Sequence, residues 1–179
     1  MKMQPLKYSL SVTFGRFNIP HMGHVQLIRK MLNRGEHANV YVSAGKLNNE
    51  WDLRVLALRT SCRKERIDLS RVTFLKANSP YSAINETTEI VPPEDVALVL
   101  GSDQWEMGRK LSDIYDVSFV ENERTNSSTN MRFFLDREEN QDDLTKLYKG
   151  NLYAVKLAKR LRQEELNRER LSKTAAKAA

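Results

Sequence analysis

The sequence predicts an α/β fold: a doubly wound, parallel, five-stranded sheet with a C-terminal helical extension. Three observations lead to this prediction. Strand-like and helix-like stretches alternate over residues 8–135, residues 96–100 form an unbroken apolar run, and Gly15 ends the first strand where a helix should begin. An unbroken apolar strand is typical of one buried on both faces of a parallel sheet. A sheet of this Rossmann-like kind binds its ligands at the carboxyl ends of its strands.

The strands are predicted where apolar residues alternate or run together. They cover residues 8–14 (YSLSVTF), 39–43 (NVYVS), 71–75, 96–100 (VALVL) and 116–120. The helices are predicted where apolar residues recur every three or four positions, which gives residues 23–33, 52–66, 81–90 and 128–135. The resulting order is βαβαβαβαβα. The helix between the last two strands is expected from this alternation alone, and no residue range is predicted for it.

Length and composition predict one main domain. The chain has 179 residues, of which 40% are hydrophobic and 8% aromatic, enough for a single core. We expect a main α/β domain over residues 1–140, which carries the candidate sites described below, and a basic helical extension over residues 141–179. The one cysteine, Cys62, allows no internal disulfide. No leader peptide and no apolar run of about 18 residues is found, so a cytoplasmic protein without a membrane segment is expected.

The net charge of +6 belongs to the C-terminal extension. Residues 149–179 hold nine Lys or Arg and three Glu, whereas residues 1–148 hold twenty charges of each sign. The main domain therefore has no net charge with which to attract nucleic acid, and any anion site in it must be local.

The first candidate site follows the first strand, in the stretch GRFNIPHMGH at residues 15–24. Gly15 allows close approach to a phosphate, and Pro20 sets the start of a helix whose free amides attract anions. His21 and His24 are three residues apart, which directs both imidazoles toward the same anion, and Gly23 leaves room for a nucleotide. The plainer alternative is a pair of surface or capping histidines.

A second candidate site lies at residues 127–132, SSTNMR. The hydroxyls of Ser127, Ser128 and Thr129 suit a helix start that faces a polyphosphate, and Arg132 one turn later can bind phosphate oxygens through its two-pronged guanidinium. An ordinary helix cap is the alternative interpretation.

Further candidates surround these two motifs. After the apolar run, Gly101 permits close approach and Asp103 can accept hydrogen bonds from ribose hydroxyls. Trp105 could stack on a base or on another flat aromatic ring of a ligand. The alternatives are a helix cap for Asp103 and a core position for Trp105. Nucleotide-binding candidates also include three residues near the first and second strands: Arg16, Phe17 and Lys46. A solvated lysine is the alternative for Lys46.

These motifs together resemble the HxGH nucleotidyltransferase superfamily. The string GRFNIPHMGH is similar to the GRFxPxHxGH form of nicotinamide mononucleotide adenylyltransferases, and SSTNMR is similar to the SSTxxR motif of the same family. Gly101-Ser102-Asp103 resembles the family's GxD. The opening also resembles small nucleotidyltransferases encoded by phages, for which the location would be host cytoplasm or virion. The sequence has Asn126 at a position where isoleucine is common in the family.

The resemblance implies transfer of AMP from ATP to a phosphate acceptor, favouring nicotinamide mononucleotide and hence NAD, with Mg²⁺ as cofactor and release of pyrophosphate. It implies that His21, His24 and Arg132 are the principal catalytic donors. Cytidylyl transfer is the second choice of activity, because residues 124–129 match the RTEGIST motif of cytidylyltransferases only in part. Phosphopantetheine and flavin adenylylation remain open. Class I aminoacyl-tRNA synthetases share the histidine motif but need a KMSKS-type loop and a longer chain.

A structural or interaction role, for example in a virion, is the alternative from another class. The extension places Leu157 and Leu161 four residues apart and Leu166 and Leu171 five apart, an imperfect apolar stripe. Such a helix can be solvated and frayed, or it can bind a second copy or another protein; nucleic acid is the least favoured partner.

Overall fold

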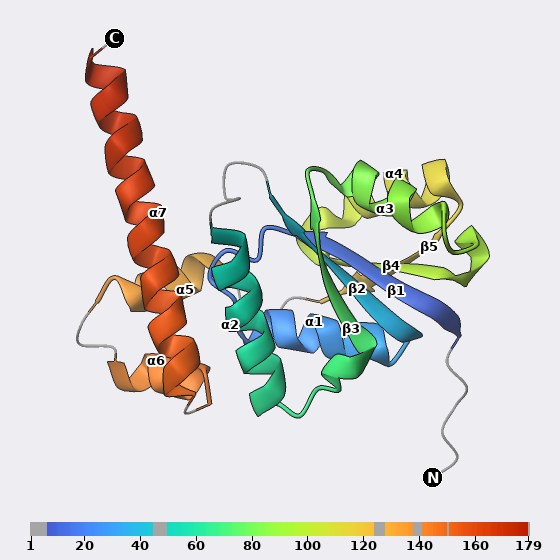
Figure 1. Cartoon of the computed structure of the whole chain (residues 1–179), viewed down its shortest axis with the longest axis horizontal. Helices are drawn as coiled ribbons and strands as arrows, with labels where there is room; N and C mark the ends of the chain where they lie inside the picture. Colours follow the sequence, from blue (N-terminus) through green and yellow to red (C-terminus); the bar gives the residue numbers. More distant parts are fainter. Residues whose placement is uncertain (1–6, 45–49, 124–127, 138–140, 150, 179) are drawn as a thin grey trace.

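A computed structural model describes residues 7–44, 50–123, 128–137, 141–149 and 151–178. It contains a five-stranded sheet in the order β3-β2-β1-β4-β5, and every pair of neighbouring strands is parallel (Figure 1). The strands are β1 Tyr8–Gly15, β2 Gly35–Ser43, β3 Val72–Ala77, β4 Val96–Gly101 and β5 Ser118–Asn122. The predicted fold class is therefore confirmed. Strand order reverses between β1 and β4, and at such a point the carboxyl ends of the strands open a crevice for a ligand.

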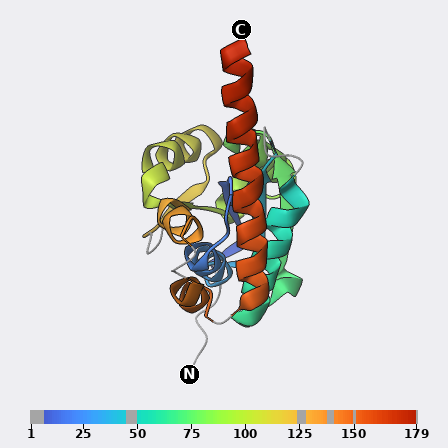
Figure 2. The same ribbon diagram turned by 90° about the vertical axis from the view of Figure 1, so that its left-hand side faces the viewer.

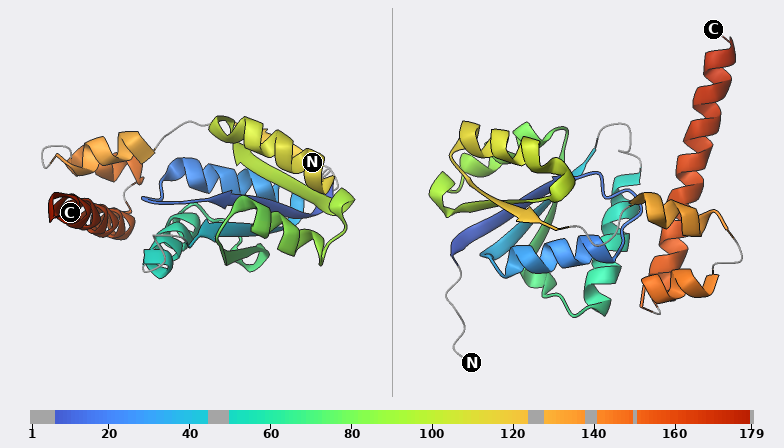
Figure 3. Two further views of the ribbon diagram at one scale, coloured as in Figure 1. Left: turned by 90° about the horizontal axis from the view of Figure 1, so that it is seen from above. Right: turned by 180° about the vertical axis from the view of Figure 1, so that it is seen from behind.

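Four helices cover the two faces of this sheet. They are α1 Met22–Leu32, α2 Trp51–Lys64, α3 Pro80–Thr88 and α4 Trp105–Tyr115. One hydrophobic cluster joins α1 and α2 to one face of the sheet, and another joins α3 and α4 to the opposite face. Figure 1 shows α1 below the sheet with α2 to its left, and α3 and α4 above the sheet; the right-hand view of Figure 3 shows the same arrangement from behind. All six residues of β4 are buried, as expected for a strand covered on both sides.

The structure moves several predicted boundaries. β2 begins at Gly35 and not at Asn39, because its first residues pair with β1 even though Glu36 and His37 are exposed and polar. The helix without a predicted range is α4. It ends at Tyr115, and its C-cap residue Asp116 adopts a left-handed conformation with φ 54°, so β5 begins two residues later than predicted, at Ser118. These differences concern polar strand ends, where apolar periodicity carries little signal.

The C-terminal part of the chain forms three helices, α5 Ser128–Leu135, α6 Gln141–Leu147 and α7 Leu152–Ala178. Figure 2 shows them together on one side of the molecule, with the C-terminal end of α7 projecting beyond the rest. Leu157 and Leu161 are buried in a third hydrophobic cluster that also contains Ile19 and Ala57 of the main domain. Leu171, by contrast, is 71% exposed. The first half of the predicted apolar stripe is thus covered within the chain, while the domain boundary at residue 140 stays a prediction.

Among the described helices, none has both the length and the apolar character that crossing a membrane requires.

Candidate active site

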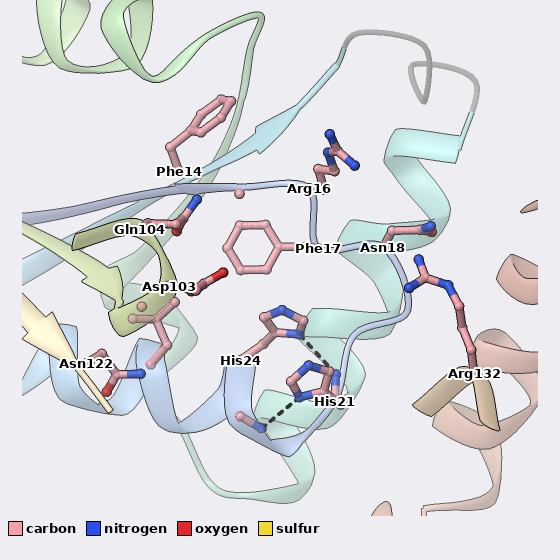
Figure 4. A pocket seen from close by; sticks show the side chains of 14 residues that line it. Phe14, Arg16, Phe17, Asn18, His21, His24, Asp103, Gln104, Asn122 and Arg132 are labelled. Carbon is pink, nitrogen blue, oxygen red and sulfur yellow. Dashed lines mark hydrogen bonds between the residues drawn. The ribbon is translucent and has the colours of Figure 1, made fainter. Parts of the chain in front are cut away.

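A cavity of about 400 Å³ opens at the carboxyl ends of β1, β4 and β5 (Figure 4). It lies at the point where the strand order reverses, and its volume falls within the range of about 300–1,000 Å³ that is usual for small-molecule sites. The residues that line it come from strand ends, from the loop before α1, from α1 and α5, and from the short 3₁₀ helix η4 (Ser102–Gln104). They are Phe14, Gly15, Arg16, Phe17, Asn18, His21, Gly23, His24, Leu27, Gly101, Asp103, Gln104, Asn122 and Arg132.

The two histidines form the N-terminal cap of α1. His21 is the N-cap residue, and its Nδ1 accepts a hydrogen bond from the amide of Gly23 at 3.1 Å. In return, Nδ1 of His24 accepts from the amide of His21 at 3.2 Å, which makes a reciprocal capping box. The two rings lie 3.9 Å apart between centroids. The capping alternative and the ligand-binding interpretation therefore describe the same two side chains.

This cap determines which nitrogen of each ring can donate. An Nδ1 atom that accepts a hydrogen bond carries no proton, so a neutral ring carries its proton on Nε2. We infer this tautomer from the heavy-atom contacts, since the contacts orient each Nδ1 toward an amide. Both imidazoles are thereby held as Nε2–H donors beside the cavity, an arrangement suited to an anion that gains charge.

The loop between β1 and α1 has a strained backbone. Phe17 and Ile19 have positive φ values of 46° and 61°. Left-handed conformations are costly for residues other than glycine, and most of all for a β-branched residue such as isoleucine. Strain of this kind persists only where surrounding contacts hold it in place. Both side chains are buried, and the ring of Phe17 packs against that of His24 at 5.0 Å between centroids.

Two buried side chains hold the backbone of this loop. Arg54 of α2 donates from Nη1 to the carbonyl of Arg16 and from Nη2 to the carbonyl of Ser43 at 2.7 Å. Burial lowers the pKa of Arg54 to about 10. On the other side, the hydroxyl of Tyr148 donates to the carbonyl of Pro20 at 2.6 Å. The loop is therefore fixed from α2 and from the C-terminal helices.

Arg132 of α5 reaches the same cavity but is already paired. Its Nε and Nη2 donate to the carboxylate of Glu165 at 2.8 and 2.7 Å. Figure 4 shows the guanidinium beside the amide of Asn18 at the edge of the cavity. The structure thus brings the arginine of the second motif to the first motif, and adds an acidic partner that the sequence reading did not identify.

The residues after β4 divide between the cavity and the surface. Gly101 and Asp103 line the cavity, and the side chain of Asp103 points into it (Figure 4). Asp103 is not the N-cap residue of α4, which is Gln104. Trp105 does not line the cavity. It is 48% exposed, so it is not a core residue either, and the guanidinium of Arg109 lies 5.8 Å from its ring centroid.

Several lining residues were missed by the sequence reading: Phe14, Asn18, Leu27, Gln104 and Asn122. Applying the strand-end rule to every strand would have found two of them, because Asn122 ends β5 and Phe14 is the penultimate residue of β1. Asn18 lies inside the first motif, but its role depends on Glu165, which is 147 residues away.

Some predicted residues lie outside the described part of the chain. Lys46 and Ser127 fall in undescribed segments, and Ser128 and Thr129 begin α5 with side chains that are not described. Their predicted contact with phosphate stays a prediction.

The described residues contain no group of three or more histidine, cysteine, aspartate or glutamate side chains able to hold a metal ion by themselves. Among the described residues that line the cavity, Asp103 is the one carboxylate.

No protein-family model matches the sequence, and no curated protein is similar to it in sequence. Solved structures with the same fold are found. A bifunctional NMN adenylyltransferase/ADP ribose pyrophosphatase from Francisella tularensis matches with a TM-score of 0.61 and 15% identity, over 96% of this chain and 57% of that chain. This chain thus spans little more than half the length of that enzyme.

A second structure of the Francisella enzyme, complexed with AMP and a manganese ion, matches with a TM-score of 0.60 and 16% identity, over 95% of this chain and 56% of that one. The nicotinic acid mononucleotide adenylyltransferase of Plasmodium falciparum, complexed with APC, matches with a TM-score of 0.60 and 17% identity, over 83% of this chain and 96% of its own. At these identities the likeness concerns the fold, and the chain therefore has the fold of the nicotinamide and nicotinic acid mononucleotide adenylyltransferases.

Proposed function

We propose that the protein is a nucleotidyltransferase that transfers AMP from ATP to a small phosphorylated acceptor and releases pyrophosphate. Nicotinamide mononucleotide is the acceptor proposed first, which would make NAD the product. One observation carries the proposal: His21 and His24 line the same cavity as Arg132, more than one hundred residues later in the chain, at the carboxyl ends of the strands. The adenylyltransferase function of the structural neighbours agrees with it.

The proposed reaction is an in-line displacement. An oxygen of the acceptor phosphate attacks the α-phosphorus of ATP, a new P–O bond forms, and the bond between the α-phosphorus and the bridging oxygen of pyrophosphate breaks. The protein forms no covalent intermediate, so its contribution is positioning and charge stabilisation. The Nε2–H groups of His21 and His24 would donate to the α-phosphate oxygens, where negative charge increases.

The remaining residues would hold the rest of the nucleotide. Arg132, with Ser127, Ser128 and Thr129 of the same motif, would bind the β- and γ-phosphates. Arg16 and Lys46 would add positive charge, and Asp103 would accept from the ribose. Trp105 lies outside the cavity, and we give it no role in this proposal.

The residues of the cavity fit a magnesium-dependent reaction. Mg²⁺ usually binds through one or two carboxylates together with substrate phosphates and water. The triphosphate and water would supply most ligands of the ion, so a cavity whose described lining has one carboxylate, Asp103, fits it without a cluster of protein ligands. When bound, the ion neutralises phosphate charge. The manganese ion in the Francisella structure agrees with use of a divalent cation.

The reaction can be tested by pyrophosphate release. The full chain is incubated with Mg²⁺, with ATP or CTP, and with each of a panel of acceptors: nicotinamide mononucleotide, nicotinic acid mononucleotide, phosphopantetheine, flavin mononucleotide and phosphocholine. Release that requires both ATP and nicotinamide mononucleotide is the expected result. Release with CTP and phosphocholine alone would favour the cytidylyl alternative, and no release with any pair would overturn the proposal.

A further inference from the structure

The carboxylate of Glu165, on α7, joins the two phosphate-binding motifs. Arg132 of the second motif donates to it from Nε at 2.8 Å and from Nη2 at 2.7 Å. Asn18 of the first motif donates to it from Nδ2 at 2.9 Å. One side chain from the C-terminal helix therefore holds a residue from each motif. Figure 4 shows these two residues, Asn18 and Arg132, at the edge of the same cavity.

Glu165 is itself held firmly in place. Arg162, one turn earlier on α7, donates to its carboxylate at 2.6 Å. The same guanidinium binds both carboxylate oxygens of Asp136, just after α5, at 2.8 and 2.7 Å. Bidentate pairs of this kind fix the direction of a guanidinium as well as its distance. The side chains of Glu165 and Arg162 are each only 13% exposed, so water screens the pair less than it screens a surface ion pair.

The packing of α7 explains why Glu165 lies at this place. Leu157 and Leu161 are buried in the third hydrophobic cluster, against Ile19 of the strained loop. Glu165 follows Leu161 by four residues and therefore projects from the same side of the helix. The contacts that bury α7 also hold the loop from which Asn18 and the histidine pair extend.

We propose that Glu165 is a positioning residue of the active site, which acts by holding Arg132 and Asn18 in their places beside the phosphates. Its carboxylate takes the Nε proton and one Nη2 proton of Arg132, so a nucleotide that leaves this pair intact binds Arg132 through the remaining protons of Nη1 and Nη2. The inference deepens the proposed function and rests on it for the kinetic part of its test. It also makes α7 a part of the active site.

Two possible effects of Glu165 on a triphosphate have opposite signs. A negative charge close to a polyanion repels it, so loss of that charge alone would strengthen ATP binding. A positioning role predicts the reverse, because Arg132 and Asn18 lose the partner that holds them. The sign of the change in ATP affinity therefore separates the two.

The first test compares Glu165→Gln with Glu164→Gln, which removes the same charge at the neighbouring position outside this network. The measurements are kcat and KM for ATP, and the Kd of ATP with Mg²⁺ in the absence of acceptor. We expect Glu165→Gln to lower kcat/KM by about 10-fold or more and to raise the Kd of ATP, because small displacements of positioning groups are costly. Glu164→Gln should leave both unchanged. Unchanged or tighter ATP binding in Glu165→Gln would overturn the inference.

A double-mutant cycle tests whether Glu165 acts through Arg132. If it does, adding Glu165→Gln to the Arg132→Ala variant should lower kcat/KM and ATP affinity much less than Glu165→Gln lowers them in the wild-type chain. An equal decrease in both backgrounds would show that Glu165 does not act through Arg132, and this part of the inference would be wrong.

Glu165→Asp provides a variant that keeps the charge. The shorter side chain cannot keep all the contacts of Glu165, so positioning predicts weaker ATP binding, whereas an effect of charge alone predicts no change. Melting temperatures show whether each variant is folded at the assay temperature. This variant decides the question if Glu165→Gln does not fold.

If the wild-type chain transfers no nucleotide, the proposed function fails, yet the Kd of ATP still tests Glu165. If it does transfer and the Glu165 variants behave as wild type, the positioning inference alone fails.

Discussion

Replacing His24 with alanine tests two contributions that one imidazole makes. Its Nδ1 accepts the amide of His21 in the cap of α1, at 3.2 Å, and its remaining nitrogen carries the proposed donor toward the α-phosphate. The first contribution is structural and the second is chemical. Alanine removes both, and different measurements report each of them.

The expected loss of stability is small and the expected loss of turnover is large, so the two contributions can be measured separately. Loss of one side-chain cap costs about 1 kcal/mol, which in a chain of this length lowers the melting temperature by roughly 2–4 °C. Loss of one preorganised donor to a developing oxyanion lowers kcat by about 10²- to 10³-fold. A typical domain has a stability of about 5–15 kcal/mol, so the cap loss leaves nearly all of the protein folded. Unfolding therefore cannot account for a 10²-fold decrease in turnover.

The assay is pyrophosphate release with ATP, Mg²⁺ and the acceptor that the panel identifies, with melting temperature measured on the same samples. His37→Ala is the matched control, because His37 is an exposed residue of β2 that does not line the cavity. We expect His37→Ala to keep wild-type turnover. If His24→Ala retains more than about a tenth of wild-type kcat, the assigned role as a donor is refuted. If both variants lose turnover equally, the loss does not come from the site.

Three further predictions concern the packing and charges around the site. Tyr148→Phe removes the hydroxyl that donates to the carbonyl of Pro20, so we expect a loss of about 1–3 kcal/mol in the free energy of unfolding, measured by urea titration; an unchanged midpoint would contradict this contact. Leu161→Ala, at a fully buried position in the third cluster, should cost about 2–5 kcal/mol by the same measurement, and a cost below about 1 kcal/mol would mean that α7 is not packed as described. Burial raises the pKa of Glu165, but hydrogen bonds from its two arginine partners outweigh burial and lower it overall, and the hydrogen bond from Arg162 likewise lowers the pKa of Asp136. Both carboxylates therefore stabilise the folded chain above the usual carboxylate pKa of about 4, and this stabilisation is lost as pH falls through their lower folded-state values. From about pH 5 to pH 3 the melting temperature of the wild type should fall more steeply than that of Glu165→Gln, and equal slopes would contradict the assignment.

The fold class and much of the cavity could be predicted from the sequence because their signals are local. The alternation of strands and helices and the apolar run of β4 depend on residues that are near one another in the chain. The histidine pair belongs to the same category, since a spacing of three residues at a helix start already directs both rings the same way. α5 was predicted with the bounds that the structure shows, Ser128–Leu135.

Trp105 shows the limit of such reasoning. It follows Asp103 by two residues, and proximity in sequence suggested a shared site. The chain turns through a short 3₁₀ helix and enters α4 at this point, so Asp103 faces the cavity while Trp105 is directed elsewhere. Which side of a turn a residue faces depends on the bounds of the elements, and those are the least certain part of a sequence reading.

By itself, the sequence determined the strands of the sheet, the two candidate phosphate-binding motifs and the helical character of the C-terminal extension. Only the tertiary structure decided that the extension folds back onto α2 and the first motif, that Ile19 is buried beneath it, and that Glu165 reaches both Asn18 and Arg132. The physical reason is distance along the chain. Periodicity states which face of a helix is apolar, but what covers that face is set by the packing of segments that lie more than one hundred residues apart.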